Sequence, residues 1–433
     1  MTRQLSLPLV LVEGFLSSTS QFFWGKFEDH LNRGSNRRRI IFASVGPVSS
    51  LHDRACELYY ALKGGPVDYG EQHSIEFKHS RYGKVYEEGL YPAWSKDNPL
   101  HFLGHSIGGS TIVKLIALIT QGFFGPDAHP DMVLSVTAVS APFRGTQLVY
   151  SLGESVKAAP AVRPFSFGSI LTKSVHILAF FSPLIPLPFD LHAESRSLTY
   201  RDTSFSQLLS QLWKSDWAEG KDAAPYDVTF EAADERDAKG EGAFSRNTFY
   251  QSYTATMTER GHPNSNQHST PFAQLISPFY ITSRLISQFD FTFLRPIPSF
   301  FGRPQGEYPE KKSPVPPRGD LEGNIWAAGE EKYRANDGVV PLFSQWHPSD
   351  CSYVVSVSVP RPCLKHACHG RSAHCDHRPQ SSTPVPGKWQ VHHEPNRHHL
   401  SIIPLWYGSR SQIDFWQDLS DWLENVEAAV SSL

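Results

Sequence analysis

The pentapeptide Gly104-His105-Ser106-Ile107-Gly108 constrains the fold of this chain more than any other feature. The apolar run at residues 100–103 leads directly into it, and residues 106–120 follow with apolar side chains at helical intervals. A strand that turns sharply into a helix at Gly-x-Ser-x-Gly exposes the serine hydroxyl above a sheet and points the helix N-terminus at developing negative charge. The pattern therefore predicts Ser106 as the nucleophile of a serine hydrolase; the alternative is a glycine-rich turn without a nucleophile.

Strand and helix signals alternate around this turn. Apolar runs predict buried strands at residues 7–12, 39–45, 100–103, 132–139 and 248–255, and helical spacing predicts helices at residues 51–63, 106–120 and 412–433. Alternating strands and helices form a mostly parallel sheet with helices on its faces. Combined with the serine turn, they predict an α/β-hydrolase fold in a single domain that spans residues 1–433.

Composition excludes several classes of protein. Hydrophobic residues make up 40% of the 433 residues, which is enough for a large core, and a net charge of -3 gives no footprint for nucleic acid. No uncharged apolar stretch is long enough for a transmembrane helix. The N-terminal apolar run contains Pro8 and ends at Glu13, so we expect a core strand there rather than a signal peptide. The five cysteines do not form a disulfide pattern, which favours a cytoplasmic location over secretion.

Two segments interrupt the alternation. Residues 150–215 contain a strongly apolar stretch at 168–191, which fits either a buried helix pair or a lid whose apolar face covers an active site. Residues 357–387 form an insertion of low globular character. Its cysteines and histidines could bind a metal, but their spacing fits no standard zinc module, so we expect an unstructured loop.

A serine hydroxyl needs a base and an orienting acid, which follow it in this fold in the order Ser, Asp or Glu, His. Asp337 stands before Gly338 and an apolar run, where a strand ends in a turn, although an isolated Asp-Gly is usually a plain turn. Among the 20 histidines we choose His399, because the apolar residues 400–403 anchor its backbone. His392, His393 and His398 are expected on the surface. One oxyanion donor is expected at Ile107 and the other in the loop at Gly14-Phe15.

Together with other segments, these residues resemble a known family, the zinc-containing bacterial true lipases of the thermophilic bacillus and staphylococcal group. The similar segments are residues 45–50, 53–59, 64–70, 133–137, 145–146, 226–228 and 247–250. The resemblance covers most of residues 7–256 and resumes at 333–343 and 387–403. It implies a triacylglycerol lipase with Ser106, Asp337 and His399 as the triad and Phe15 as the second oxyanion donor.

The resemblance also implies a structural zinc ion. The matching ligand positions are Asp53, His73, His79 and Asp227. Two imidazoles and two carboxylates suit a closed tetrahedral site with no open position for chemistry. The calcium positions of the family are occupied by Ser401 and Trp406, so we expect no calcium site of that form.

Glu13 departs from the family, which has His before the Gly-Phe pair. We expect a carboxylate there to weaken oxyanion stabilisation unless it is turned away or paired. We therefore keep three alternatives open. The first is a lipase that contacts the lipid–water interface, the second is a carboxylesterase or phospholipase with the same triad, and the third is a catalytically impaired lipid-binding relative. A zinc hydrolase fits less well, because four protein ligands leave no place for water.

Overall fold

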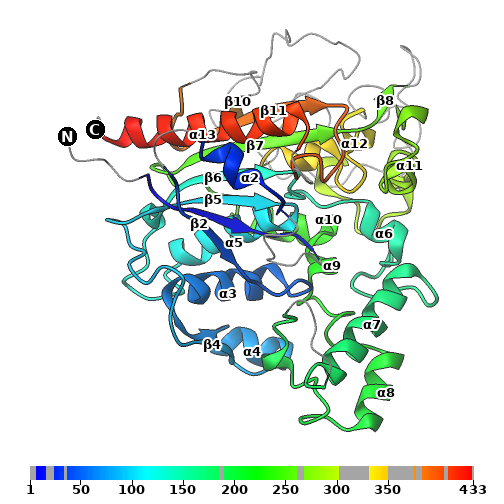
Figure 1. Ribbon diagram of the computed structural model, residues 1–433. Helices are drawn as coiled ribbons and strands as arrows, with labels where there is room; N and C mark the ends of the chain where they lie inside the picture. Colours follow the sequence, from blue (N-terminus) through cyan, green and yellow to red (C-terminus); the bar gives the residue numbers. More distant parts are fainter. Residues whose placement is uncertain are drawn as a thin grey trace, which may run out of the picture.

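A parallel sheet runs through the computed structural model, which describes residues 6–15, 24–33, 37–184, 190–260, 268–301, 331–349, 375–376, 383–403 and 408–431. The strand order is β10-β11-β7-β6-β5-β1-β2, and every neighbouring pair is parallel (Figure 1). The strands are β1 (Leu9–Val12), β2 (Ile40–Ala43), β5 (Leu100–His105), β6 (Val133–Val139), β7 (Phe249–Thr256), β10 (Cys375–Asp376) and β11 (Trp389–Pro395). The predicted α/β-hydrolase fold is confirmed.

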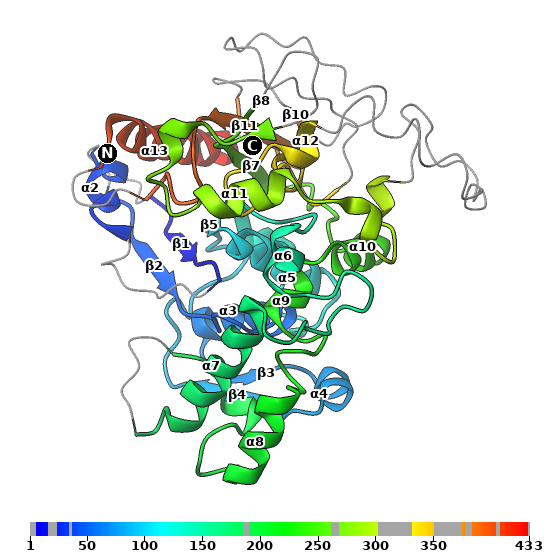
Figure 2. The same cartoon turned by 90° about the vertical axis from the view of Figure 1, so that its right-hand side faces the viewer.

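Helices cover both faces of this sheet because its central strands are apolar on both sides. In β1, Val10 and Val12 pack into the core beneath α3 (Leu51–Lys63) and α5 (Ile107–Thr120). Leu9 and Leu11 alternate with them and pack into the core beneath α2 (Phe27–Leu31) and α13 (Arg410–Ser431). Figures 1 and 2 show α13 and α2 together on one face, and α3 and α5 on the other. The two helices predicted before and after the serine turn are therefore present.

The remaining strands form two separate two-stranded sheets, and the remaining α-helices lie in the segments that connect the elements named above. They are the hairpin β3 (Gly65–Asp68) and β4 (Tyr82–Tyr86), the pair β8 (Glu259–Arg260) and β9 (His268–Ser269), and the helices α4 (Glu71–Phe77), α6 (Leu148–Leu152), α7 (Phe167–Phe181), α8 (Phe205–Trp213), α9 (Ala224–Asp227), α10 (Phe230–Ala238), α11 (Tyr280–Ser287) and α12 (Glu331–Arg334). The described helices include none with the length and apolarity that a bilayer crossing needs.

The apolar segment that could be a lid forms α7 and α8, which lie with β4 and α4 at the lower end of both views (Figures 1 and 2). Helix α7 buries Val175 and Phe180 but exposes Phe167 and Ile170, so it is neither fully buried nor polar on its outer face. Of the predicted insertion at 357–387, residues 357–374 and 377–382 lie outside the described residues.

Candidate active site and metal centre

Ser106 lies at the turn between β5 and α5, as the pentapeptide predicts. Its backbone has φ 55° and ψ -134°, a conformation that side-chain-bearing residues rarely adopt and that persists only where the surroundings impose it. The surroundings do so here: a Cβ on Gly108 would lie 2.1 Å from the carbonyl oxygen of Val12, so only glycine lets the helix start this close to β1. The Ser106 N–H donates to Val139 O over 2.9 Å, which fixes the turn against β6.

Asp337 and His399 are hydrogen-bonded to each other. The distance from His399 Nδ1 to Asp337 Oδ2 is 2.9 Å, and the His399 backbone N–H donates to Asp337 O over 2.9 Å. The second carboxylate oxygen, Oδ1, accepts the backbone N–H groups of Val339 and Val340 at 2.9 and 2.8 Å. Because a carboxylate only accepts, His399 Nδ1 is the donor in this hydrogen bond, which leaves Nε2 as the ring nitrogen that can accept a proton.

The pair sits against the serine turn through His105. The rings of His105 and His399 lie 4.9 Å apart, and His105 Nε2 donates to the His399 carbonyl over 2.8 Å. Burial lowers the pKa of His105 to about 3, so this ring is neutral and acts as a spacer. In the described part of the chain Ser106 and His399 share no hydrogen bond. Such contacts are often long in the absence of substrate.

Phe15 and Ile107 both border the space next to Ser106. Neither backbone N–H donates to another group among the described residues, so both are free to bind an anion. A Cβ on Gly14 would lie 2.8 Å from Ser106 Cβ, so glycine is required for the loop after β1 to approach the serine this closely. The predicted donors are thus brought to the predicted nucleophile.

Glu13, the residue expected to disturb this arrangement, is turned away and paired. Its side chain is buried, and Oε1 accepts the indole N–H of Trp24 over 2.8 Å. Burial raises the pKa of Glu13 to about 7. The Glu13 carbonyl accepts a hydrogen bond from Arg54, which also donates to Gly46 O at 2.6 Å and thereby holds the chain just before the Gly14 turn.

A second group of titratable side chains gathers around the first turn of α3. Asp53, His73, His79 and Asp222 each offer a ligand atom, and these atoms lie within 4.8 Å of one another. His73 Nε2 is 3.2 Å from Asp53 Oδ1 and 3.2 Å from Asp222 Oδ1, and His79 Nε2 is 3.5 Å from Asp222 Oδ2. Ligands of tetrahedral zinc lie about 3.3 Å apart, so these spacings fit a metal ion.

The sequence predicts Asp227 as the fourth member of this group, whereas the structure places Asp222 there. Asp227 ends α9 and binds the start of α3 instead: its Oδ2 accepts the Leu51 N–H over 2.6 Å, and its Oδ1 lies 3.4 Å from Arg236. Burial raises its pKa to about 6. Asp222, five positions earlier, reaches the histidines because the loop before α9 passes beside them.

Arg196, which no sequence pattern indicated, completes the group. Its Nη2 donates to Asp53 Oδ2 over 2.6 Å and also to Asp222, and its guanidinium lies 5.4 Å from the ring of Trp217. Burial would raise the pKa of Asp222, but hydrogen bonds from His73 and His79 and the charge of Arg196 together lower it. Burial likewise opposes protonation of His73, yet its bonds to Asp222 and Asp53 raise its pKa to about 9.

Comparisons with known proteins show the family of this chain. A family model described as "Lipase-like, C-terminal domain" matches residues 6–292. The chain belongs to this lipase-like family. It is similar to Lipase 1 of Staphylococcus aureus, with 28% identity over 373 residues (80% of this chain and 46% of the relative), and to the lipase of Staphylococcus hyicus, with 29% identity over 375 residues (79% and 53%). It therefore spans about half the length of these relatives.

Solved structures show the same fold for this lipase-like chain. The crystal structure of Staphylococcus hyicus lipase matches with a TM-score of 0.71 and 23% identity, over 98% of this chain and 97% of that one. EstA from Clostridium botulinum matches with a TM-score of 0.61 and 24% identity, over 98% and 89%. The resemblance to staphylococcal lipases predicted from the sequence is confirmed.

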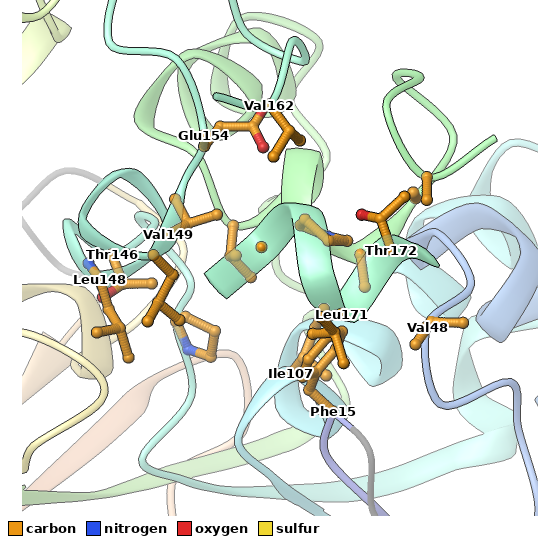
Figure 3. Close-up of a pocket in the computed structure, with 18 of the residues that line it drawn as sticks. Phe15, Val48, Ile107, Thr146, Leu148, Val149, Glu154, Val162, Leu171 and Thr172 are labelled. Atoms are coloured by element: carbon orange, nitrogen blue, oxygen red, sulfur yellow. The ribbon is translucent and has the colours of Figure 1, made fainter. Parts of the chain in front are cut away.

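An apolar cavity of about 160 Å³ opens beside the serine of this lipase-like chain (Figure 3). Phe15, Ser106 and Ile107 line one part of it, and Leu171 and Val175 of α7 line another. Trp217, which contacts Arg196, is also in the lining and packs against Val175. Helix α7 thus forms one wall of the cavity beside the serine. The apolar spacing in the sequence could not distinguish this position from that of an ordinary buried helix.

Proposed function

We propose that the protein hydrolyses carboxylic ester bonds of triacylglycerols through Ser106, Asp337 and His399. One observation carries this proposal: the His399–Asp337 hydrogen bond, with the carboxylate satisfied by backbone N–H groups, lies against a strained serine that opens onto an apolar cavity. The names of the curated relatives, both lipases, support it.

Each residue has a distinct task in this mechanism. His399 Nε2 takes the proton of Ser106, whose Oγ attacks the ester carbonyl, while Asp337 stabilises the imidazolium that forms. The N–H groups of Phe15 and Ile107 bind the oxyanion. The imidazolium then protonates the leaving alcohol, which leaves an acyl group on Ser106. A water molecule deprotonated by His399 releases the acid and restores the serine.

The size and the apolar lining of the cavity favour an acyl chain as the part of the substrate that binds there. Its lining is almost entirely apolar, and its volume of about 160 Å³ is close to that of an apolar cavity known to bind benzene, with six carbons. We therefore expect the highest kcat/KM for acyl chains of about six to eight carbons. This size also favours a second candidate function, a carboxylesterase that acts on soluble esters.

The outer surface of the lid helices supports contact with a lipid surface. Phe165, which precedes α7, is 96% exposed, and Trp213 at the end of α8 is 90% exposed. Phe167 and Ile170 are also exposed on α7. Apolar side chains gathered on adjacent helices mark surfaces that bind membranes or partners. We propose transient binding of α7 and α8 to the lipid–water interface.

We further propose that Asp53, His73, His79 and Asp222 bind a structural zinc ion. Two nitrogen and two oxygen donors are a usual zinc set, and their spacing fits tetrahedral geometry. With four protein ligands the ion has no open position, so it stabilises the fold near Trp217 and takes no part in the reaction. Chelation should then lower stability more than initial activity.

Ser106→Ala tests the activity. We expect the rate on p-nitrophenyl octanoate to fall by roughly 10⁴-fold or more, because the nucleophile is lost while the cavity remains. A variant within tenfold of the wild type would overturn the proposal. Emulsified trioctanoin distinguishes the two candidates: a lipase is activated when the substrate exceeds its solubility, whereas a carboxylesterase is not.

A further inference from the structure

Glu154 is the one ionisable side chain among the described residues that line the cavity. It is only 3% exposed, and its Oε1 has no hydrogen-bond partner in the described part of the chain. Most buried polar groups are hydrogen-bonded, and each exception requires an explanation. An unpaired carboxyl on the wall of an otherwise apolar cavity is explained when a ligand supplies the missing partner.

The position of Glu154 identifies which end of a substrate would reach it. Glu154 follows α6 and forms an antiparallel bridge with Val162. In Figure 3 Glu154 and Val162 lie together, on the opposite side of the cavity from Phe15 and Ile107. Since Phe15 and Ile107 border Ser106, an acyl chain attached at the serine would extend its far end toward Glu154.

The charges around Glu154 restrict the chemistry of that far end. Burial raises the pKa of Glu154 to about 8, and the nearby carboxylates of Glu219 and Glu231 add to the shift. A substrate carboxylate would meet three acidic groups, and an ammonium group would have to lose its hydration shell against an apolar lining. A hydroxyl group donates to a carboxylate and accepts from a carboxylic acid, so it fits Glu154 in either protonation state.

We propose that Glu154 forms a polar subsite at the far end of the cavity, where it binds the hydroxyl group of an acyl chain hydroxylated at or near its terminal carbon. This inference rests on the proposed ester hydrolysis, because the acyl chain is positioned by its bond to Ser106. The subsite makes the enzyme selective for hydroxyacyl esters over plain acyl esters of equal length.

The test compares p-nitrophenyl esters of unsubstituted and terminally hydroxylated acids of six, eight and ten carbons. The quantity measured is the ratio of kcat/KM for the hydroxylated ester to kcat/KM for the plain ester. We expect the best ratio of the wild type to exceed that of Glu154→Leu by about tenfold or more, since Leu leaves the hydroxyl unpaired. Glu154→Gln should keep most of the selectivity, because an amide both donates and accepts. Equal ratios in the wild type and Glu154→Leu at all three lengths would overturn the inference.

Matched variants separate this result from charge and folding effects. Glu219→Gln removes a neighbouring carboxylate that does not line the cavity and should leave the ratio unchanged; a tenfold loss there would contradict the role given to Glu154. Replacing a buried unpaired acid by an apolar side chain should raise the Tm by a few degrees. If Glu154→Leu fails to fold, Glu154→Met provides the same test.

Binding to Ser106→Ala distinguishes failure of the inference from failure of the proposed function. Calorimetry compares 1,8-octanediol with 1-octanol, which occupy the cavity without a reaction. If the wild type does not hydrolyse p-nitrophenyl acetate, the proposed function fails, and a preference for the diol that disappears in Ser106→Ala/Glu154→Leu still supports the subsite. If acetate is hydrolysed but no preference depends on Glu154, only the subsite is refuted.

Discussion

Asp337 and Asp222 are both buried carboxyl groups that face an imidazole, and the protein supplies their hydrogen-bond partners in different ways. Asp337 accepts two backbone N–H groups from Val339 and Val340, besides the ring of His399. Asp222 instead faces three side chains that can carry positive charge, His73, His79 and Arg196. The first carboxylate is held by its own turn, whereas the second depends on segments far apart in the sequence.

This difference separates the site proposed for catalysis from the site proposed to bind a structural metal ion. Backbone donors cannot titrate or leave, so Asp337 stays oriented while His399 changes its charge in the proposed reaction. The two carboxylates near Arg196 gain their stability only while cations remain beside them, whether side chains or a metal ion. The first site is preorganised, whereas the second joins α3, the segment between β3 and β4, and the segments that carry Arg196 and Asp222 as long as its charges are balanced.

The largest expected effect is on the preorganised site. Asp337→Asn should lower kcat on p-nitrophenyl octanoate by about 10⁴-fold, because an amide favours the wrong tautomer of His399, while the backbone contacts keep the fold. Steady-state kinetics and a thermal melt check this pair of outcomes. If Asp337→Asn also lowers the Tm strongly, the fold depends on the Asp337 carboxylate as it depends on Asp222, and the contrast between the two sites fails.

Removal of the metal should affect the other site only. Chelation of the zinc-loaded protein is expected to lower the Tm by roughly 10 °C with little change in the initial rate. The effect of the chelator should disappear in Asp222→Asn. It should persist in the matched control Asp227→Asn, because Asp227 lies five positions later and binds the start of α3 rather than the histidines. Persistence of the effect in Asp222→Asn would restore Asp227 as the fourth ligand.

Arg196→Met tests whether the second site carries its own cation. Without metal, loss of the guanidinium leaves Asp53 and Asp222 with the two histidines as their cationic partners among the described residues, so we expect destabilisation of about 3–5 kcal/mol. Zinc should reduce this loss, because it neutralises the same two carboxylates. Urea titrations with zinc and with chelator measure both values; equal losses in the two conditions would mean that Arg196 contributes packing against Trp217 rather than charge.

Glu13 is a third buried carboxyl with weaker support, since among the described residues only the Trp24 indole donates a hydrogen bond to its side chain. Its pKa is raised from 4.5 to about 7, so the folded state favours the protonated form. The unfolded chain ionises first, and wild-type stability should therefore fall as the pH rises from about 4.5 to about 7 and level off above. Glu13→Gln removes this loss and should be more stable than the wild type by about 3 kcal/mol at pH 8 and by little at pH 4. A difference independent of pH would mean that Glu13 is ionised throughout.

The same contrast explains what could be predicted from the sequence. Ser106 and Asp337 lie in short local patterns whose geometry depends on adjacent residues, and His399 precedes an apolar run that anchors it. The strands and helices around them follow from local apolar spacing. Asp222 could not be told from Asp227, because both lie near α9 and only the path of the loop decides which one faces the histidines. Arg196 and Glu154 gave no local signal, since each acquires its role from segments distant in the sequence.

The central claim, that Ser106 is an activated nucleophile, is tested most directly by reaction with a fluorophosphonate probe followed by mass spectrometry of the labelled peptide. We predict a single adduct on Ser106, formed rapidly by the wild type and by Asp222→Asn, and at least about 10³-fold more slowly by Asp337→Asn. Absence of labelling in the folded wild-type protein, or labelling at another residue, would contradict the account.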